Sequence, residues 1–158
     1  MTITELFSLA NFFVLPFWVL MIFLPKWKIT QIVMKSYIIF LPLAGLYLYL
    51  FINSITPENA EALSNPQLAD IARFFGDETA AATGWVHFLV MDLFVGRYIY
   101  LAGVKTGVLT FHSLTLCLFA GPLGLLSHIF TYWIYQRFFS QESSDTPTSD
   151  VTTSVTNN

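Results

Sequence analysis

The stretch that decides the fold is Gly84-Trp85-Val86-His87-Phe88-Leu89-Val90-Met91-Asp92-Leu93-Phe94-Val95-Gly96-Arg97-Tyr98-Ile99-Tyr100-Leu101. It is apolar and close to the length of about 20 residues that a helix needs to cross a bilayer. It nevertheless contains three ionisable side chains, His87, Asp92 and Arg97. Such groups are costly in lipid, so we expect them to face protein or water and to mark a functional site.

The composition outside this stretch indicates an integral membrane protein. Of the 158 residues, 55% are hydrophobic and 11% are charged, and the apolar residues come in runs. The net charge is -3 and the seven basic residues are scattered, so we expect no nucleic-acid partner. Cys117 is the only cysteine, which excludes an internal disulfide and a cysteine-based metal site. With only three histidines as well, we expect no metal and no cofactor.

The apolar runs predict an all-α integral membrane protein with four transmembrane helices, at about residues 6–24, 32–52, 80–104 and 107–136. They form one predicted membrane domain, residues 1–139, followed by a disordered polar tail, residues 140–158. Thr2 and Glu5 predict a capping box before the first span. The last run is longer than one crossing needs, and Gly121-Pro122 predicts a break at its centre.

A short amphipathic helix is predicted in the second loop. Asn65 is its predicted N-cap, Pro66 its first residue and Gly76 its stop signal. Its apolar face would contain Leu68, Ile71, Ala72 and Phe75. Such a helix is expected to lie on the membrane surface or to cover the mouth of the bundle as a lid.

The distribution of charge predicts the orientation. Lys26, Lys28, Lys35 and Lys105 indicate that the first and third loops are cytoplasmic. Four spans would then place both termini on the opposite side, against which Arg137 is the one dissenting charge.

The polar residues of the spans are the candidate site. Asp92 shares one helix face with Trp85, Gly96 and Gly103, so it is predicted to face the bundle. Aligning the last two spans about Lys105 predicts two polar levels with Asp92 between them: Arg97 with His112, and His87 with His128, which Asn11 would join. Each residue also has a plain interpretation. Arg97 would extend its charged group to the nearby interface, the histidines would be hydrogen-bond partners, and Asp92 would hold helices together.

Two segments resemble a known family. They are Gly84-Trp85-Val86-His87-Phe88 continuing into Asp92-Leu93-Phe94-Val95-Gly96-Arg97, and Phe119-Ala120-Gly121-Pro122-Leu123-Gly124-Leu125-Leu126. They are similar to the four-span family of the plant abscisic-acid-deficiency membrane protein required for neoxanthin synthesis, over Phe17 to Tyr132. No transit peptide precedes the first span, which favours a cyanobacterial-type member in a thylakoid or plasma membrane.

The resemblance implies a role in xanthophyll metabolism, namely isomerisation of an epoxy-carotenoid. Opening a 5,6-epoxide to an allene and a tertiary alcohol needs an acid and a base but no redox cofactor. Asp92 or His87 would be the base, and Arg97 or a protonated histidine would be the partner of the oxygen. Trp85, His112, His128 and Asn11 are the expected binding residues. The alternative is a non-catalytic protein of a photosynthetic membrane that binds carotenoid or lipid or assists assembly. The expected partners are a carotenoid or other long apolar ligand, the bilayer, and a photosynthetic complex or a second copy of the chain.

Overall fold

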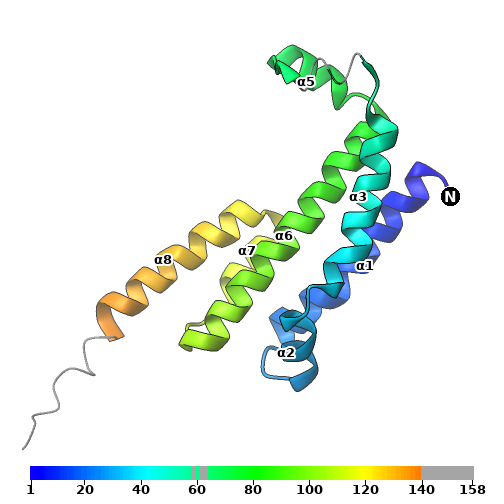
Figure 1. Ribbon diagram of the computed structural model, residues 1–158. Coiled ribbons are helices and arrows are strands. Elements are labelled where there is room, and N and C mark those ends of the chain that lie inside the picture. Colours follow the sequence, from blue (N-terminus) through cyan, green and yellow to red (C-terminus); the bar gives the residue numbers. More distant parts are fainter. Residues whose placement is uncertain (58–59, 61–63, 140–158) are drawn as a thin grey trace, which may run out of the picture.

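Figure 1 shows the computed structural model, which describes all residues except 58–59, 61–63 and 140–158. The described part is helical and contains no strand, as the sequence predicts. Its named elements are α1 (Ile3–Phe23), α2 (Lys28–Lys35), the 3-10 turn η1 (Ile38–Phe40), α3 (Leu41–Ser54), α5 (Leu68–Phe74), α6 (Glu78–Thr106), α7 (Phe111–Phe119) and α8 (Gly121–Phe139). The predicted disordered tail, residues 140–158, lies outside the described residues.

Two described helices, α1 and α6, are each long and apolar enough to cross a membrane, and α2 with α3 makes a third candidate if that bent pair is one span. The capping box before α1 is confirmed: the Thr2 hydroxyl accepts from the Glu5 N–H at 3.2 Å, and the Glu5 carboxylate accepts from the Thr2 N–H at 2.8 Å. Asp77 caps the start of α6, and Gly107, at φ 76°, ends it in the left-handed conformation that glycine permits.

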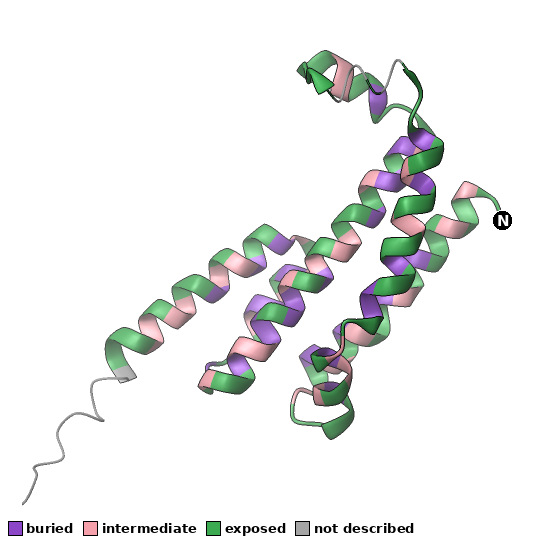
Figure 2. Ribbon diagram, in the orientation of Figure 1, coloured by how far each residue is buried: buried purple, intermediate pink, exposed green. Residues whose placement is uncertain are grey.

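The core forms where α1 and α3 pack against α6. Figure 2 shows that buried residues of these three helices lie where the helices meet, while their outer faces are exposed. Gly96 allows the close contact with α1, because a Cβ there would lie 2.5 Å from the buried Trp18 ring. On the α3 side, the Phe40 and Phe94 rings are 5.8 Å apart. The exposed outer faces are apolar, with Phe12 of α1, Leu48 of α3 and Phe88 of α6 among them, which fits contact with lipid.

The predicted second span, residues 32–52, is not one helix. Helix α2 ends at Lys35, and the chain turns by 70° before α3. Ser36 is extended, and its hydroxyl accepts from the Ile38 N–H at 3.1 Å. Pro42 then lies in the first turn of α3. Proline is tolerated there because N–H groups in the first turn make no hydrogen bond within the helix. These two residues explain why an uncharged run is broken.

The predicted fourth span, residues 107–136, forms two helices that fold back on each other. Helix α7 ends at Ala120, whose extended backbone (φ -160°, ψ 106°) reverses the chain one residue before the predicted break. The hydroxyls of Ser113 and Ser127 are 3.1 Å apart across the two helices. A Cβ on Gly124 would lie 2.5 Å from the Cα of Cys117. Neither α7 nor α8 meets the length and hydropathy of a membrane span, so the described residues do not provide the predicted fourth one.

Helix α8 therefore ends toward the same end of the molecule as α6. We call this the lysine end, because Lys26 and Lys105 lie there, and the other the acidic end, where Glu5 and Asp77 begin α1 and α6 (Figure 1). The prediction that the end of the last helix and the lysines lie at opposite ends is wrong, because the turn at Ala120 sends α8 back toward the lysine end.

The helix predicted in the second loop exists, but its start is different. It begins at Leu68 with Gln67 as its cap residue, not at Asn65 and Pro66. The predicted apolar face is largely exposed, with Leu68 86% accessible, whereas Phe74 is buried. Phe75 packs on α6, since a Cβ on Gly84 would lie 2.6 Å from its ring. Helix α5 is therefore attached at the acidic end through its last residues.

Candidate functional site

The three ionisable residues of α6 point to different neighbours and do not form one site. His87 is exposed beside α3, with its ring 5.7 Å from that of Tyr47. Asp92 contacts the start of α8, and Arg97 contacts the end of α2. The structure thus separates the three expected catalytic residues, and each must be judged by its own surroundings.

Arg97 caps the C-terminal end of α2. Its Nε donates to the Met34 carbonyl at 2.5 Å, and its Nη2 donates to the Lys35 carbonyl at 3.3 Å. The guanidinium carbon lies 4.2 Å from the centre of the Tyr37 ring. These carbonyls belong to the last turn of α2, where helix bonding leaves acceptors free and the dipole is negative. Arg97, at 7% exposure, thereby has hydrogen-bond partners without a carboxylate, and its partners are these carbonyls rather than His112.

Asp92 is the middle residue of α6, and it caps the start of α8. Its Oδ1 accepts from the Gly121 N–H at 3.1 Å, and its backbone carbonyl accepts from the Cys117 thiol at 3.4 Å. A carboxylate is favoured at a helix N-terminus, where N–H groups are free and the dipole is positive. Gly121 permits this contact, since any Cβ there would overlap the carboxylate. The prediction that Asp92 faces the bundle is confirmed.

The two histidines of the hairpin have different neighbours: His112 of α7 contacts α8, and His128 of α8 lies against α6. His112 Nε2 and the Thr131 hydroxyl are 2.8 Å apart. His128 is 4% exposed and lies between the Tyr98 and Tyr132 rings, at centroid distances of 6.2 and 6.3 Å. Among the described residues, its Nδ1 is the one buried side-chain N or O atom without a hydrogen-bond partner. A buried imidazole nitrogen in that state is available to a ligand or a water.

The expected pairing of His87 with His128 is wrong, because α8 turns back at Ala120. The alignment of the spans, which predicts Leu118 opposite Asp92, holds to within one residue, because the Cys117 thiol contacts Asp92. Beyond the turn, His128 lies at the level of Tyr98, toward the lysine end. Asn11 likewise joins neither histidine. Its Oδ1 accepts from the Trp85 indole N–H at 3.0 Å, which ties α1 to α6 near the acidic end.

A row of polar side chains follows the hairpin from its tip toward the lysine end. We call it the hairpin row, and its members are Asp92, Ser113, Ser127, His128, His112 and Thr131. Sequence reasoning missed Ser113, Ser127, Thr131 and Tyr98. The one signal was the spacing of Ser127 and Thr131, four residues apart on one face of α8.

The hairpin row offers proton donors and acceptors in apolar surroundings, but the described residues contain no cluster of three or more His, Cys, Asp or Glu that could hold a metal ion. What the row can do chemically is donate and accept protons and hydrogen bonds. The carboxylate at its tip and the free nitrogen of His128 are the groups with capacity left for a ligand.

Comparison with known proteins identifies relatives of this chain. Residues 5–128 match the family model described as ABA DEFICIENT 4-like. The chain is 38% identical over 133 residues to the chloroplastic protein ABA DEFICIENT 4 of Arabidopsis thaliana. The aligned part covers 81% of this chain and 60% of that protein, so the chain spans about three-fifths of the length of its relative. No solved structure matches.

Proposed function

Because the chain belongs to the ABA DEFICIENT 4-like family, we propose that it is a membrane protein of xanthophyll metabolism that isomerises an epoxy-carotenoid at the hairpin row. The family relationship and the apolar helices support a carotenoid as the ligand. The activity and the exact carotenoid are both proposed, because this chain aligns with only 60% of the length of its relative.

The observation that carries the proposal is the break at Ala120, opposite Asp92 and halfway along α6. At membrane depth, non-helical backbone is tolerated only where protein covers it or where it lines a cavity. Broken helices whose N-termini meet at mid-membrane are a recurring way to build binding sites in membrane proteins. The break in this chain lies beside a carboxylate halfway along α6, with the N-terminus of α8 directed at it, and this arrangement supports the proposal.

The reaction that we propose is an isomerisation with balanced proton transfer. A base removes a vinylic proton, and the electron pair of that C–H bond becomes the second double bond of the allene. The adjacent epoxide C–O bond breaks, and its oxygen takes up a proton and stays as a tertiary alcohol. We propose Asp92 as the base and His128, through its free Nδ1, as the partner of the oxygen. His87 and Arg97 lie beside α3 and α2, so we assign them no contact with the substrate.

The test is the Asp92→Asn variant, assayed by chromatography of the pigments that the purified protein forms from violaxanthin. Asparagine keeps an oxygen that can accept from the Gly121 N–H but cannot remove a proton. We expect conversion to fall by about 10² or more, as for loss of a general base, while insertion and yield are unchanged. Asp70→Asn, which changes an α5 carboxylate paired only with Arg73, is the matched control and should convert normally.

Two outcomes contradict the enzymatic proposal. Full conversion by Asp92→Asn would show that the carboxylate only caps α8. Wild-type protein that binds the xanthophyll without converting it would favour a non-catalytic carotenoid-binding or assembly protein. A photosynthetic complex and a second copy of the chain stay predicted partners, which copurification from a photosynthetic membrane would test.

We further propose three crossings, formed by α1, by α2 with α3, and by α6, with α7 and α8 as a re-entrant hairpin. The lysine end would then be cytoplasmic, or stromal in a thylakoid. The bent pair of α2 and α3 and the reversal at Ala120 support this arrangement.

A further inference from the structure

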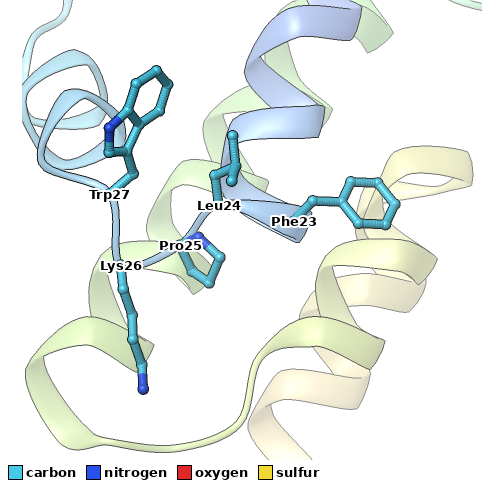
Figure 3. A pocket seen from close by; sticks show the side chains of 5 residues that line it. All are labelled: Phe23, Leu24, Pro25, Lys26 and Trp27. Atoms are coloured by element: carbon cyan, nitrogen blue, oxygen red, sulfur yellow. The ribbon is translucent and has the colours of Figure 1, made fainter.

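Two hollows lie next to each other at the lysine end, on either side of the turn that joins α1 to α2. The first, about 520 Å³, is lined by Phe23, Leu24, Pro25, Lys26 and Trp27 (Figure 3). The second, about 430 Å³, lies between this turn and the end of α6. Its lining includes Lys26, Gln31, Tyr100, Val104, Leu109 and Thr110. Pro25 and Lys26 line both hollows, so the two are parts of one surface.

The turn between the hollows is held rigidly by hydrogen bonds to its backbone. The Tyr100 hydroxyl of α6 donates to the Pro25 carbonyl at 2.7 Å, and the Thr30 hydroxyl of α2 donates to the Leu24 carbonyl at 2.8 Å. The side chain of Lys26 takes part in neither bond and extends past the turn, away from Trp27 (Figure 3). The hollows are therefore preformed, and their one charged lining residue is free to bind a ligand.

The lining is apolar apart from a few groups. Phe23 is 68% exposed and Leu109 is 70% exposed, so both offer apolar surface to an acyl chain at the hollows. Gln31 and Thr110 add an amide and a hydroxyl beside Lys26. An apolar wall with a cation and hydrogen-bond donors at its edge matches a lipid, whose chains are apolar and whose head group is polar.

The charge at this end selects an anionic head group. Lys28 follows the first hollow in sequence, and Lys105 lies beside Val104 of the second. The acidic side chains that the structure describes lie elsewhere: Glu5, Asp70, Asp77 and Glu78 are at the acidic end, and Asp92 is halfway along α6. Juxtamembrane lysines without nearby carboxylates attract anionic lipids.

From these observations we propose that the hollows beside Lys26 bind one anionic glycerophospholipid, with its phosphate on Lys26 and its acyl chains along Phe23 and Leu109. The proposal concerns a site separate from the hairpin row and does not depend on the reaction proposed there. Lys28 and Lys105 add to the attraction, and Trp27, 47% exposed, lies at the depth where indoles meet head groups.

Native mass spectrometry of the full chain, purified in detergent and titrated with phosphatidylglycerol, tests the proposal. Phosphatidylcholine with the same acyl chains is the comparison lipid. We expect phosphatidylglycerol to be retained in preference, and Lys26→Gln to weaken its binding about fivefold, the loss typical of removing one lysine near an anionic surface. Lys26→Arg, which keeps the charge, should retain most of the binding.

Lys35→Gln is the matched control. Lys35 is also exposed and at the lysine end, but it lies at the far end of α2 and lines neither hollow. Equal losses from Lys26→Gln and Lys35→Gln would overturn the proposal, since they would indicate diffuse attraction. Equal retention of phosphatidylcholine would overturn it too. Displacement of the lipid by millimolar inorganic phosphate would show a free-anion site instead. Unchanged melting temperatures would confirm that the variants are folded.

Discussion

At the scale of single residues, Asp92 and Arg97 show how one membrane helix can carry two ionisable groups of opposite sign, Arg97 buried and Asp92 partly buried. They do not pair with each other. Asp92 lies at the positive N-terminus of α8, and Arg97 lies at the negative C-terminus of α2. Each side chain contacts backbone groups at a helix end that have no partner within the helix. One contact thus gives a partner both to the ionisable side chain and to the free backbone groups. Both residues therefore have structural roles that a reaction at Asp92 would add to.

Arg97→Met tests the structural role of Arg97. The substitution leaves the carbonyls of Met34 and Lys35 without their charged donor. We expect a loss of roughly 2 to 3 kcal/mol in the free energy of unfolding, as for hydrogen bonds from charged groups. Arg97→Lys should lose less, because it keeps the charge but not the fork of donors. Thermal unfolding in detergent measures both, and Arg137→Met, at an exposed position of α8, should match the wild type. Equal melting temperatures for Arg97→Met and the wild type would contradict this role.

At the scale of elements, the contacts that close the α7–α8 hairpin can be trapped by a cross-link. In a Cys117→Ser background, we expect Ser113→Cys with Ser127→Cys to form an intramolecular disulfide, because the native hydroxyls are 3.1 Å apart. In a single straight helix these positions would be about 21 Å apart, at 1.5 Å per residue. Mass spectrometry with and without reductant detects the bond.

The control for the cross-link pairs Ser113→Cys with Phe130→Cys, which is exposed on α8. This pair should remain reduced under the same oxidation. Failure of the first pair to oxidise, in folded protein, would mean that α7 and α8 do not lie against each other.

The sequence predicted α1 and α6 well because their signals are local. Thr2 with Glu5 and an uninterrupted apolar run define α1, and Lys105 with Gly107 marks the end of α6. It predicted a break near Gly121 but not the direction in which the chain continues, since that direction depends on the packing of Gly124 against Cys117, which no sequence pattern indicates. The bend at Ser36 was missed because one serine in an apolar run is a weak signal.

The candidate site could be predicted only in part for the same reason. That Asp92 faces the bundle follows from helix periodicity. Aligning two helices about a tight turn predicts Leu118 opposite Asp92, one residue from the observed contact at Cys117. The partners of Arg97 are backbone carbonyls, which every residue has and no sequence pattern identifies. The hairpin row needed the reversal at Ala120, so its serines and Thr131 could not be assigned together.

At the scale of the whole molecule, the proposed re-entrant hairpin would change the predicted topology and would remove its one inconsistency, the position of Arg137. With α8 returning to the lysine end, Arg137 in its last turn joins Lys26 and Lys105 on the same side. Five of the six cations outside α5, Arg97 being the sixth, then lie at one end: Lys26, Lys28, Lys35, Lys105 and Arg137. This distribution agrees with the positive-inside rule, with Arg73 of α5 as the one basic side chain at the acidic end.

Labelling of single cysteines in sealed vesicles tests this topology. In a Cys117→Ser background, we expect a membrane-impermeant maleimide to label Lys28→Cys and Gln136→Cys from the same side and Asp77→Cys from the other. The background protein without cysteine should stay unlabelled. Labelling of positions 28 and 136 from opposite sides would restore four crossings and refute the re-entrant hairpin.

The shortness of α7 bears on how a substrate arrives. Nine residues rise about 13.5 Å at 1.5 Å per residue, less than half of a hydrocarbon layer about 30 Å thick. In the proposed re-entrant arrangement, the other leaflet adjoins α6 beyond the tip of the hairpin. A rod-shaped carotenoid dissolved in that leaflet, the proposed substrate, would then diffuse laterally until one of its ends meets Asp92. Such lateral entry from the bilayer would need no aqueous cavity and no moving gate.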